Sequence, residues 1–194
     1  MRYRAKGQVW PRAGGCAGGF SLIELMVTIA VLAIVLAMAV PAFAALINGN
    51  RLVAQANELV ASLQLARSEA VRRNAKVALC RSSDGSSCAG AGVAWSGWIV
   101  RVSSSGELLR ANLVNPSVQV HASPAVNDNG AAVVFYPDGL ARDASNGLLA
   151  ASIAVCMAVS RPENNQRRIG IAAGSRVAIS SENTEAACAA PADE

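Results

Sequence analysis

Apolar residues fill one uninterrupted segment near the start of the chain, from Phe20 to Ile47. These 28 residues include a single charged side chain, Glu24. As an α-helix, a segment of this length spans about 42 Å, which exceeds the roughly 30 Å hydrocarbon core of a bilayer. We therefore predict a helix over residues 20–47 that crosses a membrane and extends beyond it.

After residue 50 the apolar positions recur in steps of three and four, the spacing of one helix face. This stripe comprises Leu52, Ala56, Leu59, Leu63, Ala66 and Ala70. Glu69 lies four residues before Arg73, the favourable order for an ion pair on a helix surface. The pattern predicts an amphipathic helix over residues 51–74 that packs its stripe against the following domain, with a partner-binding face as the alternative.

From residue 76 onward the pattern changes to short apolar runs separated by Gly, Ser, Asn, Asp and Pro, which is typical of antiparallel sheet. Eight strands are predicted, at residues 77–81, 97–102, 108–112, 118–121, 132–136, 152–157, 168–171 and 176–180. The expected fold is α+β, with a long N-terminal helix packed on an antiparallel sheet. The globular head then covers residues 48–194, and its β-rich part covers 76–194.

The charge of the chain is concentrated at its N-terminus. Four of the 17 basic residues, and no acid, lie in the first 19 residues, so the other 13 basic residues balance 13 acidic ones. Overall basicity is therefore no argument for a nucleic-acid-binding domain. A basic leader before an apolar segment predicts a cytoplasmic N-terminus and a single-pass protein whose head lies in the periplasm or outside the cell.

Two ordinary interpretations of the apolar segment are a cleaved secretory signal, cut after Ala39 or Ala44, and a plain membrane anchor. Neither explains Glu24, because an acid moved toward the middle of a bilayer costs about 2.5–3.5 kcal/mol unless it finds a partner. The retained charge indicates a specific counter-charge.

The junction of leader and apolar segment reads GGFSLIEL at residues 18–25. It resembles the signal of type IV prepilins and type II secretion pseudopilins. That resemblance implies cleavage by prepilin peptidase between Gly19 and Phe20, N-methylation of Phe20, and pairing of Glu24 with the N-terminal amine of a neighbouring subunit during assembly. Residues 1–19 are then a leader, and Cys16 is removed with it. Pro41 matches the proline that kinks the helix in the family.

The same resemblance implies the location and partners. The chain is expected in the inner membrane first and in the extracellular pilus afterwards. Its partners are prepilin peptidase and other major and minor pilins.

Four cysteines remain after the leader, an even number in a chain expected to be exported, which indicates disulfides. Four cysteines permit three connectivities. We expect the sequential one, Cys80 with Cys88 and Cys156 with Cys188, and free thiols are the alternative.

Catalytic and metal-binding patterns are few. His121 is the single histidine, so the sequence offers neither a usual zinc site nor an orienting base for the Ser/Gly-rich turns. We expect no enzyme activity, no metal and no cofactor.

Further pieces of the chain look like the GspH/FimT group of minor pilins and pseudopilins, most like FimT. They are residues 66–71 (ARSEAV), 80–85 (CRSSDG) with Cys88, 95–100 (WSGWIV), 107–110 (ELLR), 135–139 (FYPDG), Cys156 and 167–169 (RRI). For Trp95 and Trp98 we favour packing in the core over stacking on nucleic-acid bases.

FimT-like proteins are implicated in DNA capture for natural transformation through a C-terminal Gly-Arg-x-Arg stretch. The matching residues 175–178 read SRVA, so only Arg176 is retained. If residues 167–180 form a hairpin, Arg167 and Arg168 would join Arg176 in one patch for sequence-independent contact with double-stranded DNA. Scattered arginines on a solvated edge strand are the alternative.

The sequence therefore predicts a minor pilin of a type IV pilus that takes part in assembly, with DNA capture as an added role. A dedicated DNA-uptake receptor pilin and a type II secretion pseudopilin remain alternatives.

Overall fold

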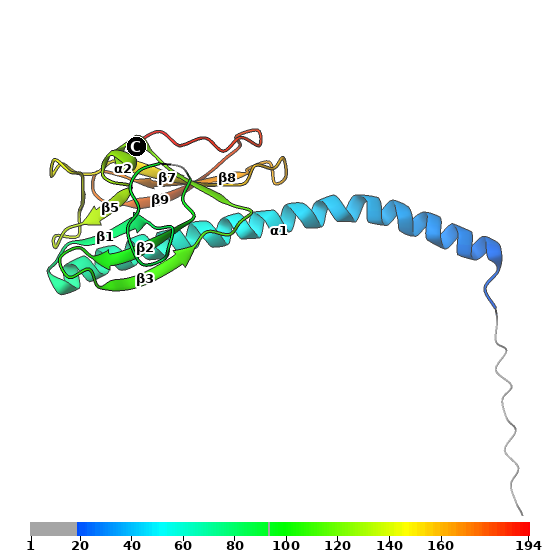
Figure 1. Cartoon of the computed structure of the whole chain (residues 1–194). Coiled ribbons are helices and arrows are strands. Elements are labelled where there is room, and N and C mark those ends of the chain that lie inside the picture. The colour runs from blue at the N-terminus through cyan, green and yellow to red at the C-terminus, as the bar shows by residue number, and fades with distance from the viewer. Residues whose placement is uncertain (1–18, 93) are drawn as a thin grey trace, which may run out of the picture. The chain divides into compact units, whose positions relative to one another are not determined.

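The computed structural model describes residues 19–92 and 94–194 (Figure 1). The chain divides into two compact units, one ending at Pro41 and the other running from Ala42 to Glu194. The expected leader and Cys16 lie outside the described residues, apart from Gly19. Helix α1 (Leu22–Arg73) begins in the first unit and continues into the second.

The apolar side chains of α1 in the first unit are exposed, Leu22 by 76% and Met38 by 75%. Among the described residues, α1 is the one helix long and apolar enough to cross a membrane. Exposing this much apolar surface to water costs free energy, whereas the hydrocarbon core of a membrane would cover it. The first unit of α1 therefore fits a membrane anchor.

The end of α1 is set by Asn74, which has a positive φ of 50°. The Ala75 N–H donates to the Ala70 carbonyl at 3.2 Å, and the Asn74 N–H donates to the Val71 carbonyl at 3.3 Å. These two bonds form a Schellman motif, which ends a helix by reversing the backbone at a residue that tolerates the left-handed conformation. The predicted end near residue 74 is confirmed to within one residue.

Two antiparallel sheets follow in the second unit, and Figure 1 shows them as separate layers. The five-stranded sheet has the order β3-β2-β1-β5-β6, with β1 (Val77–Arg81), β2 (Gly97–Val102), β3 (Leu108–Leu113), β5 (Ala132–Phe135) and β6 (Ala141–Arg142). The four-stranded sheet has the order β4-β7-β8-β9, with β4 (Gln119–Ala122), β7 (Ala151–Cys156), β8 (Gln166–Ile171) and β9 (Val177–Glu182). A short helix, α2 (Pro124–Asp128), connects β4 to β5.

All six residues of the predicted stripe on α1 are at most 1% exposed and belong to one core cluster with side chains of both sheets. Burying them removes apolar surface from water at about 25 cal/mol per Å², the main favourable contribution to this packing. Trp95 and Trp98 are also buried, which confirms the core role predicted for them. The α+β fold with a long helix packed on antiparallel sheet is thus confirmed.

Candidate processing and assembly site

The first turn of α1 is capped by Ser21, which immediately precedes the helix. The Ser21 hydroxyl accepts a hydrogen bond from the Glu24 backbone N–H at 3.2 Å, and the Leu25 N–H donates to the Ser21 carbonyl at 3.1 Å. Ser21 and Glu24 have the Ser-x-x-Glu spacing of a capping box. The bond seen here uses the Glu24 backbone N–H, so the local role belongs to the Ser21 hydroxyl. The sequence prediction missed this cap, although the spacing was visible in the sequence.

Gly19, Phe20 and Glu24 are all exposed, and the Phe20 side chain is 79% exposed. Within the described residues the Glu24 carboxylate forms no ion pair. A negative charge in the first turn interacts favourably with the positive end of the helix dipole. The carboxylate therefore remains accessible to a positive group from outside the chain.

Pro41 lies inside α1, whose helical assignment continues across it. Its ring removes one N–H from the helix ladder, and it is also the last residue of the first compact unit. The kink expected at Pro41 stays a prediction.

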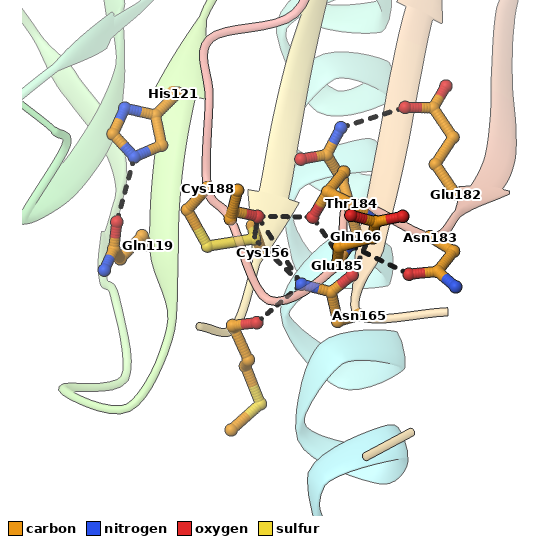
Figure 2. Close-up of a disulfide and its surroundings, with 12 residues drawn as sticks. Gln119, His121, Cys156, Asn165, Gln166, Glu182, Asn183, Thr184, Glu185 and Cys188 are labelled. Atoms are coloured by element: carbon orange, nitrogen blue, oxygen red, sulfur yellow. Dashed lines mark hydrogen bonds between the residues drawn. A yellow bond between two sulfur atoms is a disulfide. The ribbon is translucent and has the colours of Figure 1, made fainter. Parts of the chain in front are cut away.

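The four cysteines form two disulfides in the structure, Cys80–Cys88 and Cys156–Cys188, which is the sequential connectivity. Figure 2 shows the second disulfide beside Asn165. The Asn165 side-chain amide donates to the Met157 carbonyl at 2.9 Å, and its oxygen accepts the Thr184 backbone N–H at 2.9 Å. The buried Asn165 thus joins the β7–β8 loop to the C-terminal segment next to the disulfide.

The three arginines proposed for DNA contact do not form one patch. Strands β8 and β9 do form the expected hairpin, with Arg168 opposite Ser180. However, Arg167 and Arg168 are neighbours on one strand, so their side chains point to opposite faces of the sheet. Arg176 precedes β9 at the turn of the hairpin, where its carbonyl accepts the Ala172 N–H at 3.1 Å. The prediction of a shared patch is therefore wrong, because strand alternation separates the two adjacent arginines.

The guanidinium of Arg168 is bound by the C-terminal segment of the chain. It donates to the carbonyls of Ala192 at 3.2 Å and Asp193 at 3.3 Å, and it lies 3.2 Å from the Glu194 carboxylate. The Glu194 side chain lies over Gly170, and a Cβ at this position would displace its carboxylate. Sequence reasoning missed this contact because the last six residues carry no periodic pattern.

His121 lies in β4, where its Nε2 is 3.1 Å from the Gln119 side-chain oxygen (Figure 2). Partial burial lowers the pKa of its imidazole. Across residues 19–92 and 94–194, no three His, Cys, Asp or Glu side chains are grouped so as to hold a metal ion.

Comparisons with known proteins show which families and structures the chain is similar to. The sequence matches the family model described as type II transport protein GspH over residues 55–175 and the prokaryotic N-terminal methylation motif over residues 16–40. Two crystal structures of the type IV minor pilin FimU from Pseudomonas aeruginosa PAO1 are similar to the chain at 23% identity. One covers 68% of this chain and 89% of its own with a TM-score of 0.48, and the other covers 64% and 89% with a TM-score of 0.45. A search of curated proteins finds no match.

The exposed apolar helix with its N-terminal methylation motif, followed by a β-rich head, defines a pilin-like protein, a minor pilin or pseudopilin. More than half of the chain matches the GspH model, and the protein therefore belongs to the GspH family. The methylation motif implies processing by prepilin peptidase and assembly with other pilins. Pilins and pseudopilins are structural proteins rather than enzymes. The closer relation to FimT stays a prediction.

Proposed function

We propose that this protein is a minor pilin of a type IV pilus, incorporated in the filament or at its tip and taking part in pilus assembly. The observation that carries the membrane anchoring and assembly in this proposal is the arrangement at the N-terminus. Glu24 lies in the capped first turn of an exposed apolar helix, within a methylation motif, and has no counter-charge in the described part of its own chain.

In this proposal, prepilin peptidase cuts between Gly19 and Phe20 and Phe20 becomes the methylated N-terminus. Before assembly the chain spans the inner membrane once, with its N-terminus in the cytoplasm and its head in the periplasm. In the filament, Glu24 pairs with the N-terminal amine of a neighbouring subunit. Two opposite charges about 4 Å apart attract far more strongly in an apolar medium than in water, provided that both are buried together.

A type II secretion pseudopilin is the second candidate, and the match to the GspH model favours it. The two functions share processing, membrane anchoring and assembly. They differ in which filament contains the protein.

Deleting the coding sequence in the host and assaying both systems tests the proposal. We expect loss or strong reduction of surface pili, with secretion of type II substrates unchanged, and recovery of the protein in the sheared pilus fraction after complementation. Normal piliation together with a secretion defect would replace the pilus assignment with the pseudopilin assignment.

DNA capture is the finer role implied by the resemblance to FimT, and the three candidate arginines give it little support. Arg168 is held by the C-terminal segment, Arg167 lies on the other face, and Arg176 alone is exposed at the hairpin turn. Phosphate contact by one arginine predicts a salt slope near one for double-stranded DNA, against about three for a shared patch. Titrating labelled duplex with the full chain at low and moderate salt measures this slope.

A further inference from the structure

The loop between β7 and β8, residues 157–165, closes onto α1 directly after the apolar segment ends. The Asn48 side-chain amide donates to the Arg161 carbonyl at 3.1 Å. Next to it, the Pro162 ring lies against Gly49, with its Cγ 4.0 Å from the position that a Cβ on Gly49 would occupy. Because Ile47 is the last residue of the apolar segment, this loop lies at the level where the segment stops.

This loop is held in place at its base. The Met157 N–H donates to the Asn165 carbonyl at 3.0 Å, and the Asn165 N–H donates to the Glu163 carbonyl at 3.0 Å. The Cys156–Cys188 disulfide and the buried Asn165 side chain anchor the same end of the loop (Figure 2). The backbone of the loop is therefore held beside α1, so binding at this site needs little further ordering of the backbone.

Three arginines belong to the segments that meet here or directly adjoin them, and we call Arg51, Arg161 and Arg167 the basic collar. Arg51 follows Asn48 by three residues and so lies on the same side of α1. Arg51 and Arg161 are exposed and form no ion pair with any described residue. Arg167 is half-buried and donates to the Asn164 carbonyl at 3.0 Å, at the base of the loop.

One acid, the exposed Glu163, belongs to the same loop, so the collar retains a net positive charge of about two. The rest of the mature chain is close to neutral. A local excess of unpaired arginine on such a chain indicates an anionic partner, since guanidinium groups bind phosphate through two parallel hydrogen bonds.

The position of the collar along α1 indicates which partner. If Glu24 stays at the cytoplasmic border, residues 25–44 span the roughly 30 Å hydrocarbon core at 1.5 Å per residue. Asn48 and Arg51 then lie about 6–10 Å beyond its far border, and the headgroup layer is about 5–8 Å thick on each side. Long arginine side chains reach back to phosphates at this depth.

We propose that the basic collar binds the phosphate groups of anionic phospholipids and holds the head on the membrane surface before assembly. This inference rests on the membrane anchoring in the proposed function. It assigns a further role to Arg167 in place of the DNA contact expected from sequence. It also implies that recruitment into a filament must break these lipid contacts.

The test uses the full mature chain in nanodiscs of phosphatidylcholine alone or of phosphatidylcholine with phosphatidylglycerol. Amide hydrogen exchange of residues 157–165 reports whether the head lies on the lipid. We expect slower exchange in the anionic discs, and faster exchange again when the salt concentration is raised. Arg51→Gln and Arg161→Gln should each lower the ratio of bound to free head about fivefold.

Arg176→Gln is the matched control, because Arg176 is also exposed but lies at the other end of β8, at the β8–β9 turn. It should leave the exchange of residues 157–165 unchanged, and the exchange of β1 and β7 should show that every variant is folded. Exchange that is the same in both kinds of disc overturns the proposal. So does protection that depends on the number of chains per disc rather than on lipid charge, which would indicate contact between subunits.

The failure of the proposed function looks different in this experiment. If the chain is not retained in the disc at all, membrane anchoring is wrong and the collar proposal falls with it. If the chain is retained but its loop ignores lipid charge, only the collar proposal is overturned.

Discussion

Trp98 on β2 donates its indole N–H to the hydroxyl of Ser62 on α1 at 3.0 Å, and both residues are fully buried. The Ser62 hydroxyl in turn donates to the Glu58 carbonyl at 2.8 Å, one turn earlier in the helix. A hydroxyl that accepts from one element and donates within another fixes how the helix meets the sheet. This contact therefore holds α1 in a defined position on the five-stranded sheet.

Replacing Ser62 with alanine leaves the Trp98 N–H buried without a partner. We expect Ser62→Ala to lower the free energy of unfolding by about 1–3 kcal/mol, measured by chemical denaturation of the full chain in detergent. Ser68→Ala is the matched control, because the exposed Ser68 hydroxyl bonds, within the described part of the chain, only to the Leu65 carbonyl of its own helix. The double variant Ser62→Ala with Trp98→Phe should lose less than the sum of the two single changes, and simple additivity would contradict the contact.

The amphipathic stripe and the strands were predictable because burial imposes a period on the sequence. All eight predicted strands occur, with ends shifted by at most two residues. The two missed elements are α2, with five residues, and β6, with two, both too short to show a period. The predicted pair of Glu69 and Arg73 is confirmed, with 2.6 Å between the carboxylate and the guanidinium.

Contacts between distant residues were harder to predict. The Ser62–Trp98 bond joins positions 36 residues apart, and Arg168 meets a C-terminal segment with no pattern of its own. Such contacts depend on the assembled tertiary structure, which a local pattern does not encode. The shared arginine patch failed for a simpler reason, since the strand period of two already separates residues 167 and 168.

The two disulfides should differ in their effect on stability. By the loop-entropy model, removing Cys80–Cys88 costs roughly 2.6 kcal/mol and removing Cys156–Cys188 roughly 3.7 kcal/mol, because the second closes a longer loop. Paired Cys→Ser variants of the full chain, compared by chemical denaturation, test this order. Non-reducing peptide mapping tests the connectivity, and a peptide that joins Cys80 to Cys156 would contradict it.

Low pH should lower the stability of the folded head, in part because Glu69 becomes protonated and loses its ion pairs. Hydrogen bonds from Arg72 and then Arg73 lower the pKa of Glu69 from 4.5 to about 2. Because the pKa is lower in the folded state, this contribution is complete above pH 4.5 and is lost as the pH falls toward 2. We expect Glu69→Gln to lower the melting temperature at pH 7 and to reduce its fall between pH 4.5 and 2.

Glu185→Gln is the control for this pH dependence, because Glu185 is exposed and forms no ion pair within the described residues. It should leave the profile unchanged. An equal flattening in both variants would mean that general charge repulsion, rather than the Glu69 ion pairs, governs the acid response.

Processing should produce a mature chain that begins at Phe20. Gly19 has no side chain, and a bulky residue at this position should block the peptidase and leave precursor in the membrane. N-terminal sequencing and mass measurement of the wild-type and Gly19→Leu proteins check both points. Gly49→Leu is a useful comparison, since it changes a glycine outside the methylation motif and should be processed normally. A mature terminus after Ala39 or Ala44 would indicate an ordinary signal peptide instead.

The Glu24 side chain has two candidate roles that variants can separate: the return bond of a capping box with Ser21, and the proposed pairing with a neighbour's amine. Glu24→Gln keeps a side chain that can take part in a capping box but removes the charge, whereas Glu24→Ala removes both. If the charge directs assembly, both variants should accumulate in the membrane and be at least tenfold depleted from sheared filaments relative to the wild type. If capping is the main requirement, Glu24→Gln should assemble and Glu24→Ala should not.

Ser21→Ala completes this comparison, because it removes the hydroxyl that accepts the Glu24 N–H while leaving the carboxylate in place. Loss of that cap costs about 1 kcal/mol of helix stability, which a helix buried in apolar surroundings readily tolerates. We therefore expect Ser21→Ala to assemble nearly as well as the wild type. Depletion of Ser21→Ala to the level of Glu24→Ala, with Glu24→Gln unaffected, would assign Glu24 to capping rather than to the contact between subunits.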